Sequence, residues 1–240
     1  MTFRSICIAV YVFFYLIFTT PERIRLKKLE QTDPQKASRI AQEHVQKVFR
    51  HLLKISGVTI EVTGLENIPD EAALFVGNHS SYFDIIVTGA AIPGGVGFVA
   101  KDSLGNIPGL SSWMKRIHCL FLDRKDIRKG LQTILEGAEY LKEGYSMCIY
   151  PEGTRSTNGE LGEFKGGSLK MAQKAKAPIV PVAIRGTRDI FENNPGLRVC
   201  PSHVTISFGT PFKISELPAA EKKFAGEHAK QAIADMLTQQ

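Results

Sequence analysis

Cysteine is scarce in this sequence, and its few positions are not paired. The four cysteines among 240 residues lie far apart and form no Cys-x-x-Cys motif; they are Cys7, Cys119, Cys148 and Cys200. This spacing excludes the disulfide framework of a small secreted domain and is typical of a protein kept in a reducing compartment. Because Cys148 lies within an apolar run, we expect it to fill the core.

The signatures of two hydrolase classes are also missing. There is no Gly-x-Ser-x-Gly motif, which would hold a nucleophilic serine on a strand-to-helix turn. The six histidines and the acidic residues show no close spacing of metal ligands. The sequence therefore argues against a serine hydrolase and a metal hydrolase, and we expect neither a metal site nor a cofactor.

The charge of the chain is only mildly one-sided. Thirty basic and 24 acidic residues give a net charge of +6, and the sequence pI is about 9.1. No Lys/Arg-rich arm or aromatic stacking motif accompanies this excess, so nucleic acid is not an expected partner. A dispersed positive charge instead suits an anionic lipid surface or an anionic substrate.

No apolar run is long enough to cross a membrane comfortably. The longest, at residues 6–18, has 13 residues, which as a helix rise about 20 Å against a hydrocarbon core of roughly 30 Å. We expect this segment to enter one leaflet without crossing. A signal peptide is the alternative interpretation, but Pro21-Glu22-Arg23 and a basic run follow the segment instead of a small-residue cleavage site.

A second helix is predicted at residues 34–56. Asp33 is suited to cap it, Pro34 suits its first position, and Gly57 follows its end. One face of the helix is apolar and the remainder is rich in lysine and arginine, a pattern shared by ordinary surface helices and by membrane-surface helices. Next to an apolar anchor, the pattern predicts that residues 1–56 form a membrane-associated two-helix hairpin.

Short apolar runs then alternate with amphipathic segments. The runs predict strands at residues 58–64, 73–77, 96–100, 147–150, 179–184 and 204–208. Helices are predicted at residues 82–92, after Pro108-Gly109, and at 126–144, 165–176 and 219–237. In the helix at 126–144 the inward face would carry Leu131, Ile134, Leu135, Ala138 and Leu141. This alternation predicts an α/β fold with a mostly parallel sheet flanked by helices.

The stretch Asn-His-Ser-Ser-Tyr-Phe-Asp at residues 78–84 lies where a predicted strand passes into a helix. In one continuous helix, His79 and Asp84 would point roughly 140° apart. They meet only if His79 lies just outside the helix, with Ser80 or Ser81 as the N-cap and Asp84 in the first turn. A carboxylate bound to one ring nitrogen would let the other nitrogen take a proton from a hydroxyl.

An isolated His–Asp pair is more often a structural hydrogen bond, so a second signal is needed. It comes from the sequence Pro-Glu-Gly-Thr-Arg-Ser at residues 151–156, directly after the predicted strand at 147–150. Open α/β sheets bind their ligands at the carboxyl ends of strands. Two polar clusters in this position predict an active site.

With these motifs the chain resembles the glycerolipid acyltransferase family, and within it the bacterial 1-acyl-glycerol-3-phosphate acyltransferases. Four blocks over residues 56–210 carry the resemblance. They are residues 78–84, Phe-Leu-Asp-Arg at 121–124, Glu-Gly-Thr-Arg-Ser at 152–156 followed by Phe-Lys-Gly-Gly at 164–167, and Ile-Val-Pro-Val-Ala-Ile at 179–184. One departure is Gly166, where many members carry a second lysine.

The resemblance implies transfer of a fatty acyl group from a thioester to the sn-2 hydroxyl of lysophosphatidic acid, which gives phosphatidic acid. Residues 57–240 would then be the catalytic domain. His79, held by Asp84, would deprotonate the acceptor hydroxyl. Both acyl-CoA and acyl carrier protein are open as the donor, and the implied location is the inner membrane with the catalytic domain facing the cytoplasm.

The same resemblance implies roles for further residues. Arg155, Arg124 and Lys101 would hold the acceptor phosphate, with surface salt bridges as the alternative role for the two arginines. Gly153 and neighbouring amides would stabilise the oxyanion. Glu152 would either orient the acceptor hydroxyl or pair with Arg155, and Thr154 would cap a turn.

Three other functions remain open at this point. Glycerol-3-phosphate and a lysolipid without phosphate are alternative acceptors, and a catalytically silent membrane-binding module is an alternative of another class. The intact His79 and Asp84 argue against the silent module. Arg124 and Arg155 favour an acceptor that carries phosphate, and the apolar anchor favours an acceptor already in the membrane.

Overall fold

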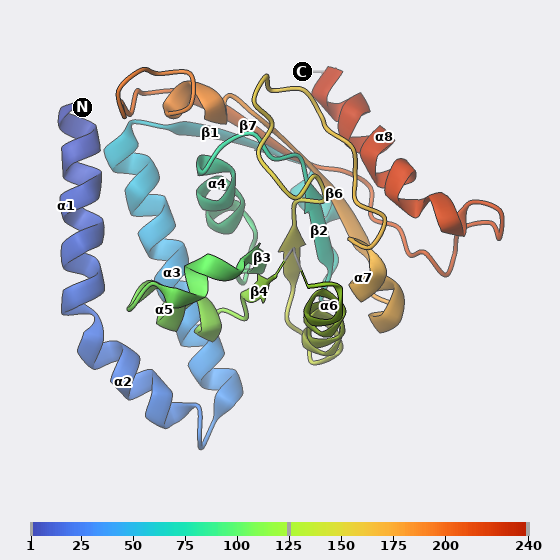
Figure 1. The fold of residues 1–240 in the computed structure, drawn as a ribbon, viewed down its shortest axis with the longest axis horizontal. Coiled ribbons are helices and arrows are strands. Elements are labelled where there is room, and N and C mark those ends of the chain that lie inside the picture. The colour runs from blue at the N-terminus through green and yellow to red at the C-terminus, as the bar shows by residue number, and fades with distance from the viewer. Residues whose placement is uncertain (1, 124–125, 239–240) are drawn as a thin grey trace.

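A seven-stranded sheet runs through the centre of the computed structural model, which describes residues 2–123 and 126–238 (Figure 1). The spatial order is β1-β7-β6-β2-β5-β3-β4, and every neighbouring pair is parallel except β6 with β7. This arrangement confirms the predicted, mostly parallel sheet. The strands are β1 (Thr59–Thr63), β2 (Leu74–Gly77), β3 (Gly97–Lys101), β4 (Leu120–Leu122), β5 (Met147–Ile149), β6 (Ile179–Arg185) and β7 (His203–Phe208).

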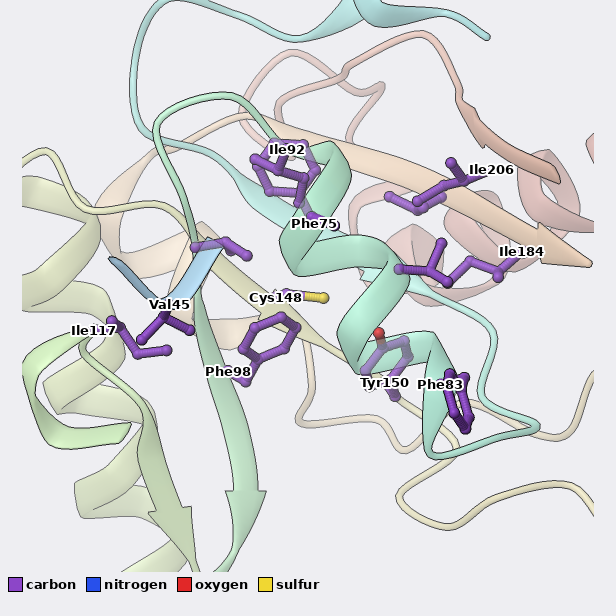
Figure 2. Packing of buried hydrophobic residues seen from close by; sticks show 14 of the residues in the cluster. Val45, Phe75, Phe83, Ile92, Phe98, Ile117, Cys148, Tyr150, Ile184 and Ile206 are labelled. Atoms are coloured by element: carbon purple, nitrogen blue, oxygen red, sulfur yellow. The ribbon is translucent and has the colours of Figure 1, made fainter. Parts of the chain in front are cut away.

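Helices cover both faces of the sheet, because successive residues of a strand point to opposite faces. In β2, Phe75 packs with α3 and α4, whereas Leu74 and Val76 pack with α6, α7 and α8. Figure 2 shows the first cluster around α4, and Cys148, 1% exposed, belongs to it as predicted. The covering helices are α3 (Pro34–Ser56), α4 (Phe83–Ala91), α5 (Leu110–Arg116), α6 (Ile127–Lys142), α7 (Lys170–Ala175) and α8 (Ala225–Thr238).

Two helices begin later than predicted. α7 begins at Lys170 rather than at residue 165, since the Lys165 amide donates to the Pro151 carbonyl and keeps this segment in the loop after β5. α8 begins at Ala225 rather than at residue 219, after turns and a short 3-10 helix. In both cases polar loop structure replaces the first predicted turns.

The inward face of α6 is narrower than predicted. Ala138 and Leu141 are buried, and Ile134 is partly buried against the core. Leu131 and Leu135, which were also expected to face inward, are 51% and 42% exposed. The N-cap prediction is correct, because the Asp126 carboxylate accepts hydrogen bonds from the amides of the first helical turn.

The predicted N-terminal hairpin is present, but its first arm is bent. α1 (Phe3–Phe18) and α2 (Thr20–Leu29) meet at a bend of 48°, and α3 is the returning arm. α2 is absent from the prediction because its basic sequence has no clear apolar face. Within residues 2–123 and 126–238 no single helix meets the length and hydropathy needed to cross a membrane, while the bent pair does so when its parts are taken together.

The hairpin packs through α3 against α4 and α5 on one side of the sheet, and α1 lies on the outside of α3 (Figure 1). α3 buries Ala41, Val45 and Leu53 in the same cluster as α4. Trp113 of α5 is 3% exposed and donates through Nε1 to Oγ1 of Thr19 at the bend, 3.1 Å away. The exposed face of α1 carries Phe3, Ile6, Val10, Phe13, Phe14, Ile17 and Phe18.

Candidate active site

Three polar segments meet at one edge of the sheet. His79 follows β2, Glu152 follows β5, and Thr187 follows β6. These strands are parallel neighbours, so their carboxyl ends lie together. The Asn78 side chain joins two of the ends, because it donates to the Ile184 carbonyl at 2.9 Å and accepts from the Ile184 amide at 2.8 Å.

The structure contains the hydrogen bond expected between His79 and Asp84. His79 Nδ1 lies 2.9 Å from Asp84 Oδ2, His79 precedes α4, and Asp84 is in its first turn. The N-cap differs from the prediction, since Tyr82 occupies that position without a side-chain cap. Instead, Asp84 Oδ2 accepts from the amides of Ser80 and Ser81, each at 2.7 Å. Asp84 thus orders the turn as well as the imidazole.

The imidazole of His79 is held on two sides. Its ring stacks on Tyr150 with centroids 4.4 Å apart, and the Tyr150 hydroxyl lies 3.1 Å from Oγ1 of the buried Thr88. The side chain of His79 remains 15% exposed. Because Nδ1 faces Asp84, Nε2 is the nitrogen left to exchange a proton with a bound molecule.

Glu152 supports the backbone of the same turn. Its Oε1 accepts from the His79 amide at 2.6 Å, and its Oε2 accepts from the Gly162 amide at 3.0 Å. Burial raises the pKa of the Glu152 carboxyl above its ordinary value. The pairing with Arg155 that the sequence allowed is not made, so Glu152 acts here on the position of His79.

Arg155 pairs with a residue that the motifs did not identify. Its Nη1 lies 3.0 Å from Glu192 Oε1, and its guanidinium carbon lies 3.6 Å from the centroid of the Tyr82 ring. Glu192 also accepts from Ser81 Oγ at 2.6 Å and from the Tyr82 amide at 2.9 Å. Glu192 therefore links Arg155 to the turn that carries His79.

The remaining predicted site residues are Gly153, Thr154, Lys101 and Arg124. The Gly153 amide donates to the Tyr150 carbonyl at 3.0 Å, so in this conformation it is not the free oxyanion donor that was expected. Thr154 Oγ1 donates to the carbonyl of Arg155 at 3.2 Å, within its own turn. Lys101 is exposed at the carboxyl end of β3. Arg124 lies outside the described residues.

An apolar groove of about 520 Å³ opens beside Tyr150, the residue that stacks on His79. It runs between the ends of β3 and β5, the first turns of α6, and the loop that contains Gly153 and Lys165. Its apolar wall includes Val99, Leu122, Leu131, Ile134 and Ile149. The partial exposure of Leu131 is explained by this position. A larger cavity, about 840 Å³, lies between α2, α3 and α5, and its lining includes none of the predicted site residues.

A mostly parallel α/β sheet with a partly buried His–Asp hydrogen bond at its carboxyl edge, next to an apolar groove, defines a class of enzyme that acts on partly apolar substrates. The comparison with protein families identifies the class more closely. The family model described as Acyltransferase matches residues 59–185, more than half of the chain. The chain belongs to this acyltransferase family, as its four blocks predicted.

Individual relatives agree with the family match. A probable 1-acyl-sn-glycerol-3-phosphate acyltransferase of Mycoplasma pneumoniae is 30% identical over 81% of this chain and 74% of its own length. The 1-acyl-sn-glycerol-3-phosphate acyltransferase of Saccharomyces cerevisiae is 33% identical, over 66% of this chain and 54% of its own length. The crystal structure of the LPA acyltransferase PlsC from Thermotoga maritima superposes with a TM-score of 0.80 at 25% identity, covering 97% of this chain and 94% of that one.

Proposed function

We propose that this acyltransferase transfers a fatty acyl group from an acyl thioester to the sn-2 hydroxyl of lysophosphatidic acid and so makes phosphatidic acid. The observation that carries the proposal is the His79–Asp84 hydrogen bond, which leaves one imidazole nitrogen for a hydroxyl. An apolar groove lies beside Tyr150, on which the imidazole stacks. The names of the similar proteins in bacteria and yeast support the acceptor.

The chemistry needs a base and a good leaving group. Nε2 of His79 takes the proton of the acceptor hydroxyl as its oxygen attacks the thioester carbonyl. The tetrahedral intermediate then expels the thiolate, which recovers the proton from the imidazolium. Asp84 keeps the ring oriented and stabilises its charged form. No acyl-enzyme is required, because a thiolate leaves readily.

We assign the acceptor and the acyl donor to different sides of His79. Arg155, already oriented by Glu192 and Tyr82, offers a forked guanidinium to the acceptor phosphate, with Lys101 and Arg124 as further cations. The groove beside Tyr150 is apolar enough to receive an acyl chain. Both acyl-CoA and acyl carrier protein fit this scheme as donors.

The exposed face of α1 supports a membrane location. Its aromatic and aliphatic side chains would enter one leaflet, which leaves residues 57–240 on one side of the membrane. In a bacterial cell this corresponds to the cytoplasmic face of the inner membrane, where a lysolipid in the leaflet can reach His79. Residues 1–56 serve as the docking part of this proposal.

An acyl-transfer assay on the purified full chain tests the function. The donors are acyl-CoA and acyl carrier protein, and the acceptors are lysophosphatidic acid, glycerol-3-phosphate and a lysolipid without phosphate. The proposal expects phosphatidic acid to be the main product. A preference for either other acceptor would replace the proposed substrate, and a lack of transfer to all three, with vesicle binding intact, would support the silent membrane module.

A further inference from the structure

The turn that follows β6 contributes two residues to the site, although no family block includes it. The match to the family model ends at residue 185, whereas Thr187 and Glu192 lie just beyond it. Both residues contact the segment that contains His79 and Asp84. This part of the chain therefore belongs to the site as much as the four blocks do.

Thr187 completes the environment of Asp84. Its Oγ1 donates to Asp84 Oδ1 at 2.6 Å, and the two residues are 1% and 0% exposed. The other carboxylate oxygen, Oδ2, already serves His79 and two backbone amides. Within the described part of the chain, Thr187 is the one residue that hydrogen-bonds to Oδ1. Without it, a buried carboxylate oxygen would lack this donor, and only the contacts of Oδ2 would orient the carboxylate.

The fold fixes Thr187 in this place. Gly186 has φ +83°, and a side chain there would meet the His203 carbonyl oxygen, which lies 2.2 Å from the position of an added Cβ. Only glycine fits at this position, and its positive φ turns the chain sharply at the end of β6. The two hydrogen bonds between Asn78 and Ile184 hold this turn level with the end of β2. Thr187 is thus directed at Asp84 by backbone structure on both sides.

We propose that Thr187 is a positioning residue for the base, which fixes the carboxylate of Asp84 so that Oδ2 faces Nδ1 of His79. The inference rests on the proposed role of His79 and Asp84 in transfer. Since Thr187 is buried and acts through Asp84, its effect should fall on turnover and leave substrate binding unchanged.

The test compares Thr187→Val, Thr187→Ser and Thr187→Ala in the full chain. Loss of a hydrogen bond to a charged group predicts a kcat about 10- to 100-fold lower for Val and Ala, with both KM values within about twofold of the wild type. Thr187→Ser keeps the hydroxyl and should restore most of the turnover. Thr133→Val is the matched control, because Thr133 is also buried but bonds to the Lys129 carbonyl in α6.

Thermal melting accompanies each assay, and if Thr187→Val does not fold, the comparison of Ser with Ala decides. Equal kcat in the hydroxyl and non-hydroxyl variants would overturn the inference, as would a loss confined to KM or an equal loss in Thr133→Val. His79→Ala is assayed in parallel. Turnover that survives in His79→Ala would refute the proposed role of His79 as the base, and a lack of transfer in the wild type would refute the proposed function. An inactive His79→Ala beside a fully active Thr187→Val would refute only the role of Thr187.

Discussion

Asp84 is a fully buried carboxylate with four hydrogen-bond donors, and the reaction proposed for His79 depends on it. Asp84→Asn keeps the size of the side chain but can present an amide to Nδ1, which would favour the wrong imidazole tautomer. We expect kcat to fall by at least about 100-fold, as for the tautomer change in a serine protease triad. Measured turnover close to that of the wild type, with folding confirmed by circular dichroism, would remove Asp84 from the mechanism.

Arg155 is the residue that we propose to bind the acceptor phosphate. Arg155→Ala should raise the apparent KM for lysophosphatidic acid by about tenfold to 100-fold, because it removes a charge-assisted contact worth roughly 1.5–3 kcal/mol. The donor KM should hardly change. Arg155→Lys keeps the charge but loses the forked guanidinium, so its KM for lysophosphatidic acid should lie between those of the wild type and Arg155→Ala.

Steady-state kinetics with each substrate varied in turn separate these effects. If the donor KM rises and the acceptor KM does not, Arg155 binds the thioester carrier and the phosphate site lies elsewhere. Arg155 also forms a salt bridge with Glu192, so its replacement removes a structural contact as well. A folding defect from this loss would show as a lower melting temperature in both variants.

At the scale of single residues, the sequence predicts contacts between residues that are near one another in the chain. The contact of His79 with Asp84 follows from five residues of spacing at a strand-to-helix turn, and it is present. Thr187 and Glu192 bond to the same turn across 103 and 111 residues. Their partners are set by the order of β2, β5 and β6 in the sheet, which no local pattern encodes. A threonine or glutamate in a loop carries no mark of such a contact.

Among the elements, α1 gives the clearest prediction, which concerns binding to lipid. Phe13 and Phe18 are 61% and 73% exposed, and burial in lipid stabilises each large apolar side chain by roughly 1.5–3 kcal/mol. Replacing both with serine should therefore reduce binding to liposomes by more than about tenfold. Phe224→Ser, which changes an equally apolar exposed residue near α8, is the control and should bind normally.

Sedimentation with liposomes that contain anionic lipid, at low and high salt, measures this effect. These substitutions are preferable to deletion of α1, because its other face carries Ile8, Tyr15 and Leu16 against the core. Unchanged binding of the double variant would show that α1 does not dock the protein. A tag at residue 1 protected from protease in sealed vesicles would show instead that the first arm crosses the membrane.

The predicted and observed elements differ mainly where the sequence is highly charged or where loop contacts determine the local structure. The strands with strong apolar runs appear close to their expected bounds, whereas β4 was not predicted. α2 forms although its sequence is mostly charged, since Leu26 is buried against the core and Trp113 holds the preceding bend. Tertiary contacts of this kind override weak local preference.

At the scale of the whole molecule, a partly buried histidine makes the fold sensitive to acid. His118 joins the loop after α5 to α3, with Nε2 2.8 Å from Ser38 Oγ, and its ring stacks on Tyr145 at 3.7 Å. Burial lowers the pKa of His118 from 6.5 to about 4. Below pH 6.5 the imidazole is protonated in the unfolded chain but stays neutral in the folded chain, so the free energy of unfolding should decrease as the pH falls. By pH 4 the decrease from this group should reach about 3 kcal/mol.

Urea unfolding between pH 7 and 4 measures this loss. His118→Asn cannot titrate, and asparagine tolerates the positive φ of 59° at this position. The variant should be less stable at pH 7, because it loses the ring stacking, yet its stability should decline less steeply with acid. An identical slope in both proteins would assign the acid sensitivity to other groups.

The burial of α3 in the same cluster as α4 has a consequence for how the chain matures during synthesis. Residues 1–56 leave the ribosome before the residues that cover α3, so the hairpin emerges with apolar surface on the exposed face of α1 and on its inner side. If the hairpin docks as proposed, the bilayer would cover that surface until α4 is made. Attachment to the membrane would then precede completion of the sheet, and a hairpin exchanged between relatives would succeed only if its α4 partner were exchanged with it.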